Sequence, residues 1–275
     1  MVSKESNGMG RFDGKVAVLT GAASAVDGEL MGFSGAVAWR FMREGGKGVV
    51  LTDMKDEAGE KSAASLRKAG FDAVYSHLEV TDESQWKAAV EVARKRYGRL
   101  DLLVNAAGII DRRSINDTPV DEWRRVMDVS ATGVFLGTKI CAGLLGQSGG
   151  GAIVNISSMA SKMAGAYGAA YATSRSAILQ FTKVAAIQYA GQGTRVNAVL
   201  PGWVHTPFTT WAHDDVAQRD ARTQRIPLGR WGTPEEIAAV ILFLGSDDAA
   251  YVTATEILVD GGVIAAVGAP SPKTK

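Results

Sequence analysis

Three residues in the middle of this 275-residue sequence are spaced for proton transfer: Ser158, Tyr171 and Arg175. Ser158 follows an apolar, β-branched run at 151–157, and Tyr171 opens a proline-free segment with apolar residues at helical spacing. Tyr171 and Arg175 are four residues apart, so on a helix they share one face. A cation beside a phenol favours its ionised form. With the Ser158 hydroxyl alongside, the three side chains suit a site that holds a substrate oxygen and transfers a proton to it.

Taken alone, the same pattern also describes a half-buried tyrosine on an amphipathic helix with a solvated arginine, so the surrounding elements must decide. Apolar segments alternate with helical ones along the chain. The predicted strands are 15–20, 48–53, 73–78, 100–105, 151–157, 195–200 and 256–260. The predicted helices are about 36–44, 55–69, 84–96, 121–145, the segment from 171 onward, and 234–245. Near-continuous apolar strands belong to parallel sheets covered on both faces, so we predict an α/β fold with one doubly wound parallel sheet.

That domain is expected over 14–264, between a polar N-terminal tail at 1–13 and a disordered tail at 265–275. The net charge of +1 is too small to indicate electrostatic binding to nucleic acid or to an anionic membrane. The lone cysteine, Cys141, excludes an internal disulfide framework and fits a reducing compartment. The first residues lack the apolar core of a signal peptide, and no apolar run is expected to reach the length of a membrane span. These features predict a cytoplasmic protein.

A glycine-rich loop after the first predicted strand suits a phosphate group. Gly21 follows that strand and Gly32 opens the next helix, where glycines let the backbone approach a pyrophosphate. An acid about 20 residues beyond the glycines binds the adenosine ribose hydroxyls. Counting back from Asp53 reaches Gly32 rather than Gly21, so 25–31 is interpreted as an insertion whose acids point to solvent. Since the Asp53 carboxylate repels a 2′-phosphate, the predicted cofactor is NAD.

With these features together, the chain resembles the short-chain dehydrogenase/reductase family from residue 14 to 262. The resemblance is carried by Thr20-Gly21, Gly32, Asp53, Asn105-Ala106-Ala107-Gly108, Ser158, Tyr171, Pro201-Gly202-Trp203-Val204-His205-Thr206, Gly229-Arg230-Trp231-Gly232-Thr233-Pro234-Glu235-Glu236 and Asp260-Gly261-Gly262. It implies a Rossmann sheet, a nicotinamide cofactor along the carboxyl edge of the sheet, and hydride transfer between that cofactor and an alcohol/carbonyl pair. It also implies a homotetramer, with the helices at 121–145 and 171–189 at the interface.

The resemblance further implies which residues form the site. Catalytic roles fall on Ser158, Tyr171, Arg175 and Ser130. Cofactor contacts fall on Gly21, Ala23, Gly32, Phe33, Asp53, Met54, Glu79, Val80, Asn105, Ala106, Gly108, Tyr171, Arg175, Pro201, Gly202, Val204 and Thr206. The expected partner is a small alcohol or ketone.

Four departures from the family pattern stand out: the insertion at 25–31, Ser34 at the third glycine, Ser130 at the central-helix asparagine, and Arg175 at the active-site lysine. Arg175 keeps the positive charge but cannot deprotonate, so a proton relay through an amine is blocked. Ser130 has a shorter reach than asparagine. Two interpretations stay open: an enzyme with a modified proton path, and a nucleotide-binding pseudoenzyme acting as a sensor or scaffold. A non-redox isomerisation or elimination has no positive support in the sequence.

The loop at 206–226 shows little periodicity and is predicted to be a mobile substrate lid. Trp203, Phe208, Trp211 and Trp231 lie in or beside it. Either these aromatic residues indicate an apolar or ring-containing substrate, or they pack the lid, and the sequence favours neither.

The three histidines, His77, His205 and His213, are scattered without metal-ligand spacing, so no metal site is predicted. His205 lies in the segment that resembles the family's nicotinamide loop. It either lines the substrate mouth or is a surface loop residue.

Overall fold

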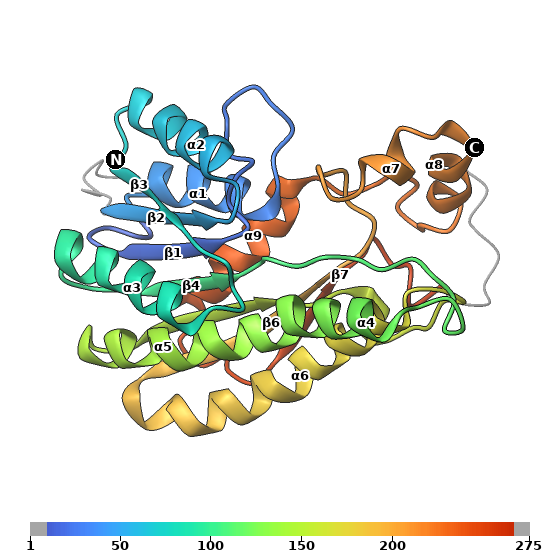
Figure 1. Ribbon diagram of the computed structural model, residues 1–275. Helices are drawn as coiled ribbons and strands as arrows, with labels where there is room; N and C mark the ends of the chain where they lie inside the picture. Colours follow the sequence, from blue (N-terminus) through green and yellow to red (C-terminus); the bar gives the residue numbers. More distant parts are fainter. Residues whose placement is uncertain (1–9, 267–275) are drawn as a thin grey trace, which may run out of the picture.

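Seven parallel strands form a single sheet in the order β3-β2-β1-β4-β5-β6-β7 (Figure 1). The computed structural model describes residues 10–266, so the predicted tails lie outside the described residues over 1–9 and 267–275. The strands are β1 Val16–Thr20, β2 Gly48–Asp53, β3 Ala73–His77, β4 Leu102–Asn105, β5 Gly151–Ile156, β6 Thr194–Pro201 and β7 Glu256–Val259. Each predicted strand is present, with ends shifted by no more than two residues. The predicted doubly wound α/β fold is confirmed.

Between two parallel strands the chain must run back to the starting end of the sheet, and here helices make each of these connections. The helices therefore cover both faces of the sheet. They are α1 Phe33–Arg43, α2 Asp56–Lys68, α3 Glu83–Tyr97, α4 Val120–Met127, α5 Gly133–Gln147, α6 Ala169–Tyr189, α7 Thr210–His213, α8 Val216–Thr223 and α9 Pro234–Gly245. In Figure 1, α1, α2 and α9 lie on one face, and α3, α5 and α6 lie on the other. Two large apolar clusters, one under each helical layer, make up most of the core.

The helix predicted at 121–145 is interrupted, which corrects the expectation of one continuous helix. A π-helical turn, Asp128–Thr132, joins α4 to α5. A π turn widens the helix by one residue without disturbing the apolar pattern, so periodicity alone does not reveal it. The predicted site residue Ser130 lies on this turn.

The same stretch, Val120–Gln147, is long and apolar enough to cross a membrane by length and composition. The expectation that no apolar run reaches that length is therefore wrong. A core helix meets the same criterion, and 56% of the apolar window is buried within the protein. Packing of α5 against α3 and α6 explains its apolar character.

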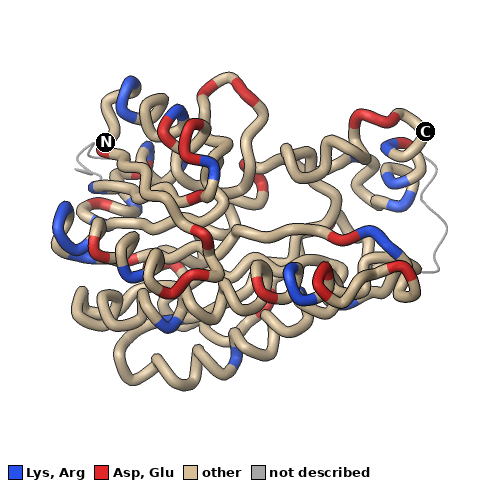
Figure 2. The backbone as a smooth tube through the Cα atoms, in the orientation of Figure 1, with Lys and Arg blue, Asp and Glu red and all other residues tan. Residues whose placement is uncertain are grey.

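Figure 2 shows Lys and Arg intermixed with Asp and Glu over α2, α3 and α4, whereas α5 and α6 carry few charged residues. The total of 30 Lys and Arg against 29 Asp and Glu matches that mixture. The lid segment at 206–226 is not irregular, which corrects the sequence interpretation. It contains the short helices α7 and α8, which stand to one side of the sheet in Figure 1.

Candidate active site

The candidate site lies at the carboxyl edge of the sheet, where all seven strands end on the same side. β1 pairs with both β2 and β4, so the chain changes direction across the sheet at β1. Ligands of open α/β sheets bind outside the strand ends at such a switch point. Most of the predicted site residues lie at the ends of β1 to β6 or just after them, whereas Tyr171 and Arg175 lie on α6 and Ser130 on the π turn.

The turn after β1 allows an unusually close backbone approach. Gly21 adopts φ +67°, and a Cβ atom there would lie 3.1 Å from the Ala107 Cα after β4. The Thr20 hydroxyl accepts hydrogen bonds from the amides of Ala106 and Ala107 at 2.9 and 3.0 Å, which joins the two loops. Gly21 and Ala106 therefore lie side by side, at the turn where the sequence predicts cofactor binding.

The N-terminus of α1 is free to bind an anion. Its N-cap, Gly32, has no side-chain cap, and the first turn contains no acidic residue. Unpaired amides and the helix dipole there favour a phosphate group. Phe33 is the first residue of α1, while Ser34 replaces the third family glycine without distorting the loop, because its hydroxyl donates to the Thr20 carbonyl at 2.6 Å. These residues fit the pyrophosphate of a nicotinamide cofactor.

Hydrogen bonds at the base of the insertion at 25–31 separate it from the N-terminus of α1. The Gly32 amide donates to the carbonyl and the hydroxyl of Ser24, at 3.2 and 3.1 Å. Residues 27–30 are exposed, as predicted for the excursion. Ala25 differs: it is fully buried, and its carbonyl accepts the Trp39 indole N–H at 2.8 Å. The insertion therefore projects to solvent but is anchored to α1.

Asp53 occupies the end of β2 beside the glycine loop. Its Oδ2 accepts the Ala23 amide at 3.1 Å, and its Oδ1 accepts the Lys55 amide at 3.1 Å. These bonds fix the carboxylate at the position where an adenosine ribose lies in this kind of fold. Met54, next to it, is 60% exposed, so its side chain is free to cover an adenine ring.

Ser158 and Tyr171 lie at the junction of β5 and α6. Ser158 is extended and caps a short 3₁₀ turn, Met159–Ser161, by accepting the Ala160 amide at 3.1 Å. Ser157 donates its hydroxyl to the Arg175 carbonyl at 2.8 Å, which ties the strand end to the helical turn that follows Tyr171. Both Ser158 and Tyr171 are partly exposed at the edge of the sheet, as a proton-transfer pair requires.

Arg175 is 4% exposed and lies beneath the ring of Tyr171. Its Cζ is 4.9 Å from the Tyr171 ring centroid, and its Nη1 donates to the Ile156 carbonyl at 2.9 Å. A Cβ atom at Gly108 would lie 2.1 Å from Arg175 Nη2, so only glycine leaves room for the guanidinium. The guanidinium therefore makes a cation–π contact with the ring of Tyr171.

Ser130 is fully buried on the π turn, and its hydroxyl has no hydrogen-bond partner within residues 10–266. A buried polar group without a partner is uncommon and costs free energy, which favours a role such as holding a water molecule. The π turn contacts α6, the helix of Tyr171.

The remaining predicted cofactor residues lie at the same edge, but several of their side chains are buried, including those of Asn105 and Val80. The Asn105 side chain points into the interior, where it donates to Asn155 Oδ1 at 2.8 Å, so it joins β4 to β5. Glu79 and Val80 follow β3; Val80 packs in the core. Gly108 follows β4, Pro201 is the last residue of β6, and Gly202, Val204 and Thr206 follow β6.

Three tryptophans of the lid region pack on another tryptophan or on an arginine. Trp203 and Trp231 have ring centroids 5.4 Å apart. The Arg222 guanidinium lies 4.6 Å from the Trp203 ring and 5.3 Å from the Trp211 ring. This arrangement supports the packing alternative for the tryptophans. Phe208 differs, because it is 39% exposed and its ring centroid lies 6.3 Å from that of Tyr171.

Sequence reasoning did not single out Asp111. It is 3% exposed in the segment after β4, and its Oδ2 has no hydrogen-bond partner within the described chain. A Cβ atom at Gly168, the N-cap of α6, would lie 2.8 Å from the Asp111 carbonyl. Asp111 therefore lies beside the start of the helix that carries Tyr171. No motif marks it; only the contact between the two segments does.

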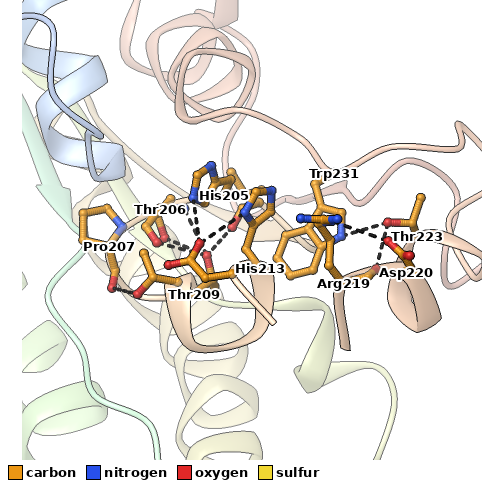
Figure 3. A network of polar contacts seen from close by, with 12 residues as sticks. His205, Thr206, Pro207, Thr209, His213, Arg219, Asp220, Thr223 and Trp231 are labelled. Atoms are coloured by element: carbon orange, nitrogen blue, oxygen red, sulfur yellow. Dashed lines mark hydrogen bonds and ion pairs between the residues drawn. The ribbon is translucent and has the colours of Figure 1, made fainter. Parts of the chain in front are cut away.

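Two of the three histidines come together, which corrects the prediction that they are scattered. The rings of His205 and His213 stack at 3.6 Å between centroids and 11° between planes (Figure 3). Asp214 Oδ1 lies 3.9 Å from His205 Nε2 and 3.5 Å from His213 Nδ1. Partial burial and the adjacent His213 lower the pKa of His205. His77 is separate from this cluster and pairs with Asp56.

Comparison with known proteins agrees with this fold. A family model described as enoyl-(acyl carrier protein) reductase matches residues 28–264. The chain belongs to the short-chain dehydrogenase/reductase family and is an oxidoreductase of the kind that acts on CH–OH groups with a nicotinamide cofactor.

Two curated relatives are similar over almost their whole length. One is the 2,5-dichloro-2,5-cyclohexadiene-1,4-diol dehydrogenase LinX of Sphingobium indicum, 38% identical over 252 residues, 92% of this chain and 97% of the relative. The other is the cyclopentanol dehydrogenase of a Comamonas species, 38% identical over 259 residues, 94% of this chain and 100% of the relative.

A solved structure shares the fold. The gluconate 5-dehydrogenase of Burkholderia cenocepacia, determined with NADP and tartrate, superposes with a TM-score of 0.85 at 30% identity, covering 93% of this chain and 97% of that one.

Proposed function

We propose that this chain is an NAD-dependent oxidoreductase that interconverts a cyclic secondary alcohol and its ketone. The observation that supports it most directly is the position of the Arg175 guanidinium, beneath the Tyr171 ring. This pair lies at the edge of the sheet where Gly21 allows a close approach of the backbone. The same edge carries Ser158 and Asp53. The single cysteine, Cys141, is buried, and burial raises the pKa of its thiol, which suits an enzyme of the reducing cytoplasm.

In this proposal, Tyr171 is the proton-transfer group. The Ser158 hydroxyl donates a hydrogen bond to the substrate oxygen, and the Tyr171 phenolate accepts the hydroxyl proton during alcohol oxidation. A bound nicotinamide supplies the hydride acceptor for oxidation and the hydride donor for reduction. In ketone reduction, the neutral phenol returns the proton to the carbonyl oxygen.

Arg175 holds its positive charge against the Tyr171 ring but does not carry the proton, because a guanidinium does not deprotonate in proteins. The proton must therefore leave Tyr171 by a path that avoids residue 175. The unpartnered Ser130 hydroxyl, on a turn packed against α6, is suited to hold a water molecule on that path.

A cyclic, mainly apolar substrate fits the side chains beside Tyr171. Phe208 presents a partly exposed ring 6.3 Å from the ring of Tyr171, which favours a flat or cyclic apolar group between the lid and α6. The names of the two curated relatives point the same way, since both act on ring alcohols.

The cofactor preference is tested by steady-state rates with NADH and with NADPH over a panel of cyclic and acyclic ketones. We expect turnover with NADH and cyclic ketones, and at least tenfold lower kcat/KM with NADPH, because Asp53 repels the 2′-phosphate. Asp53→Ala should narrow that difference, while Asp56→Ala, an acid one turn further on, should leave it unchanged. A parent enzyme that prefers NADPH would refute the NAD assignment.

We further propose a homotetramer that uses α4, α5 and α6 as its interface. These helices carry exposed apolar side chains, among them Val120, Phe135, Val184 and Ile187, of which Ile187 is 78% exposed. Light scattering after size-exclusion chromatography should give the mass of four chains. Ile187→Glu should reduce that mass, whereas Tyr251→Glu, at an exposed position outside these helices, should not. A monomeric parent protein would contradict the proposal.

A further inference from the structure

Arg112 connects the lid to the segment beside the helix of Tyr171, and the proposed proton transfer does not use it. It is an exposed residue in the segment that follows β4. Its Cζ lies 4.2 Å from the ring centroid of Trp211, on the short lid helix α7. Within residues 10–266, the Arg112 guanidinium makes no hydrogen bond or ion pair, so the contact with Trp211 is the interaction that holds it.

The backbone around Arg112 is fixed to the start of α6. The amide of Gly168, the N-cap of α6, donates to the Arg113 carbonyl at 3.1 Å. A Cβ atom at Gly168 would lie 2.8 Å from the Asp111 carbonyl oxygen and 3.9 Å from the Tyr171 Cβ. The residues on both sides of Arg112 therefore contact the turn that leads into Tyr171, and the guanidinium extends to the lid from a fixed base.

The lid end of this contact depends on packing for its position. The helix α7 spans four residues, Thr210–His213, and a helix this short is not stable by itself. Trp211 packs against an apolar cluster that includes Trp231 and, from the segment after β5, Met159. The guanidinium of Arg222, on α8, lies 5.3 Å from the same ring. Arg112 therefore adds an attachment after β4 to the one that Met159 provides after β5.

This attachment affects the site because Trp211 follows Phe208 by three residues. The Phe208 ring centroid lies 6.3 Å from that of Tyr171. A guanidinium within about 6 Å of a tryptophan ring is attracted to its face, and at exposed sites this attraction favours the contact by about two- to fivefold. Holding Trp211 in place therefore holds Phe208 beside Tyr171.

We infer that Arg112 is a positioning residue, whose contact with Trp211 keeps the lid docked with Phe208 beside Tyr171. Arg112 acts through these two lid side chains rather than on the reacting atoms. The consequence for catalysis rests on the proposed function: a docked lid keeps a cyclic ketone against Tyr171, and an undocked lid lets it leave. The docking itself does not depend on that function.

Hydrogen–deuterium exchange of the full chain, without substrate or cofactor, measures the docking directly. The amides of Ala212, His213 and Asp214 donate to carbonyls at the start of α7, so they are protected while this short helix is docked. In Arg112→Ala their exchange should be about two- to fivefold faster than in the parent, because the cation–π contact is lost. Exchange in the buried strand β2 should not change.

Arg113→Ala is the matched control, because it removes the neighbouring exposed arginine and leaves the backbone hydrogen bond to Gly168 in place. Its lid should exchange like that of the parent. A double-mutant cycle with Trp211→Leu tests the pairing itself. Once the indole ring is gone, adding Arg112→Ala should accelerate exchange no further.

Steady-state kinetics test the consequence for the site. With NADH and a cyclic ketone, Arg112→Ala should raise KM by about two- to fivefold and leave kcat within about twofold of the parent, since the groups that transfer the proton are untouched. Faster lid exchange with an unchanged KM would overturn the positioning role. A parent without turnover would refute the proposed function, whereas the exchange experiment would still decide whether Arg112 holds the lid.

Three results of the exchange experiment would overturn the inference. They are parental exchange of the lid in Arg112→Ala, equal acceleration in Arg113→Ala, and additive effects of Arg112→Ala and Trp211→Leu.

Discussion

The Tyr171→Phe variant is expected to lower kcat/KM for ketone reduction by about 10²–10⁴-fold, the range that a positioned acid–base group contributes. Phenylalanine keeps the ring against which the Arg175 guanidinium packs and removes only the oxygen that transfers the proton. NADH affinity, measured by fluorescence titration, should therefore change little. A large loss of rate with intact cofactor binding assigns the proton transfer to the phenol.

Tyr167→Phe provides the control for that substitution. Tyr167 precedes α6 and is 69% exposed, so removing its hydroxyl should leave the rate within about twofold of the parent. A Tyr171→Phe enzyme that keeps more than half of the parental rate would rule out Tyr171 as the proton donor.

The Arg175→Met variant is expected to show the second large effect. Removing the cation that packs on the Tyr171 ring should lower kcat/KM for alcohol oxidation by about tenfold or more, since a desolvated cation–π contact contributes about 2 kcal/mol. Cofactor binding should weaken too. The Ile156 carbonyl loses its donor, which should cost about 1–3 kcal/mol in the free energy of unfolding.

Lys183→Met is the matched control, because it removes an exposed cation from the same helix. It should change neither the rate nor the pH profile of kcat/KM. Arg175→Lys should preserve or increase the activity, because lysine restores the charge together with a group that can lose a proton.

Two outcomes would contradict this account of Arg175. An Arg175→Met enzyme with the parental rate and pH profile would make the guanidinium a bystander. A parent chain without turnover, combined with activity in the Arg175→Lys/Ser130→Asn double variant, would favour the pseudoenzyme interpretation. In that case the two substituted residues would account for the lost chemistry.

The fold and the main chemical residues follow from the sequence because they depend on local patterns. Buried parallel strands are apolar throughout, so the run 48–53 identifies β2 without any knowledge of its neighbours. The spacing from Gly32 to Asp53 revealed the insertion, because a strand, a helix and a turn of fixed geometry lie between them. The four-residue spacing of Tyr171 and Arg175 likewise placed both side chains on one face of α6.

Other features depend on contacts between segments that are distant in sequence or on backbone geometry without a residue signature. The π turn at Asp128–Thr132 leaves the apolar pattern intact, so the prediction of one continuous helix was wrong. Asn105 belongs to a loop motif, but its side chain turns inward because Asn155 on the next strand offers a hydrogen-bond partner. The sequence predicts Ala25 as part of a solvent-exposed insertion. In the structure it is anchored, because Trp39 donates a hydrogen bond to its carbonyl.

The histidine cluster shows the same limit most clearly. His205 and His213 are eight positions apart in a segment without regular periodicity, so the sequence predicted scattered histidines. The turn at 206–209, where the Thr209 hydroxyl donates to the Val204 carbonyl at 2.5 Å, folds the chain back so that α7 returns to His205. Spacing along the chain predicts proximity only within regular elements. In a folded loop, the path of the backbone decides which side chains meet, and that path is set by tertiary contacts.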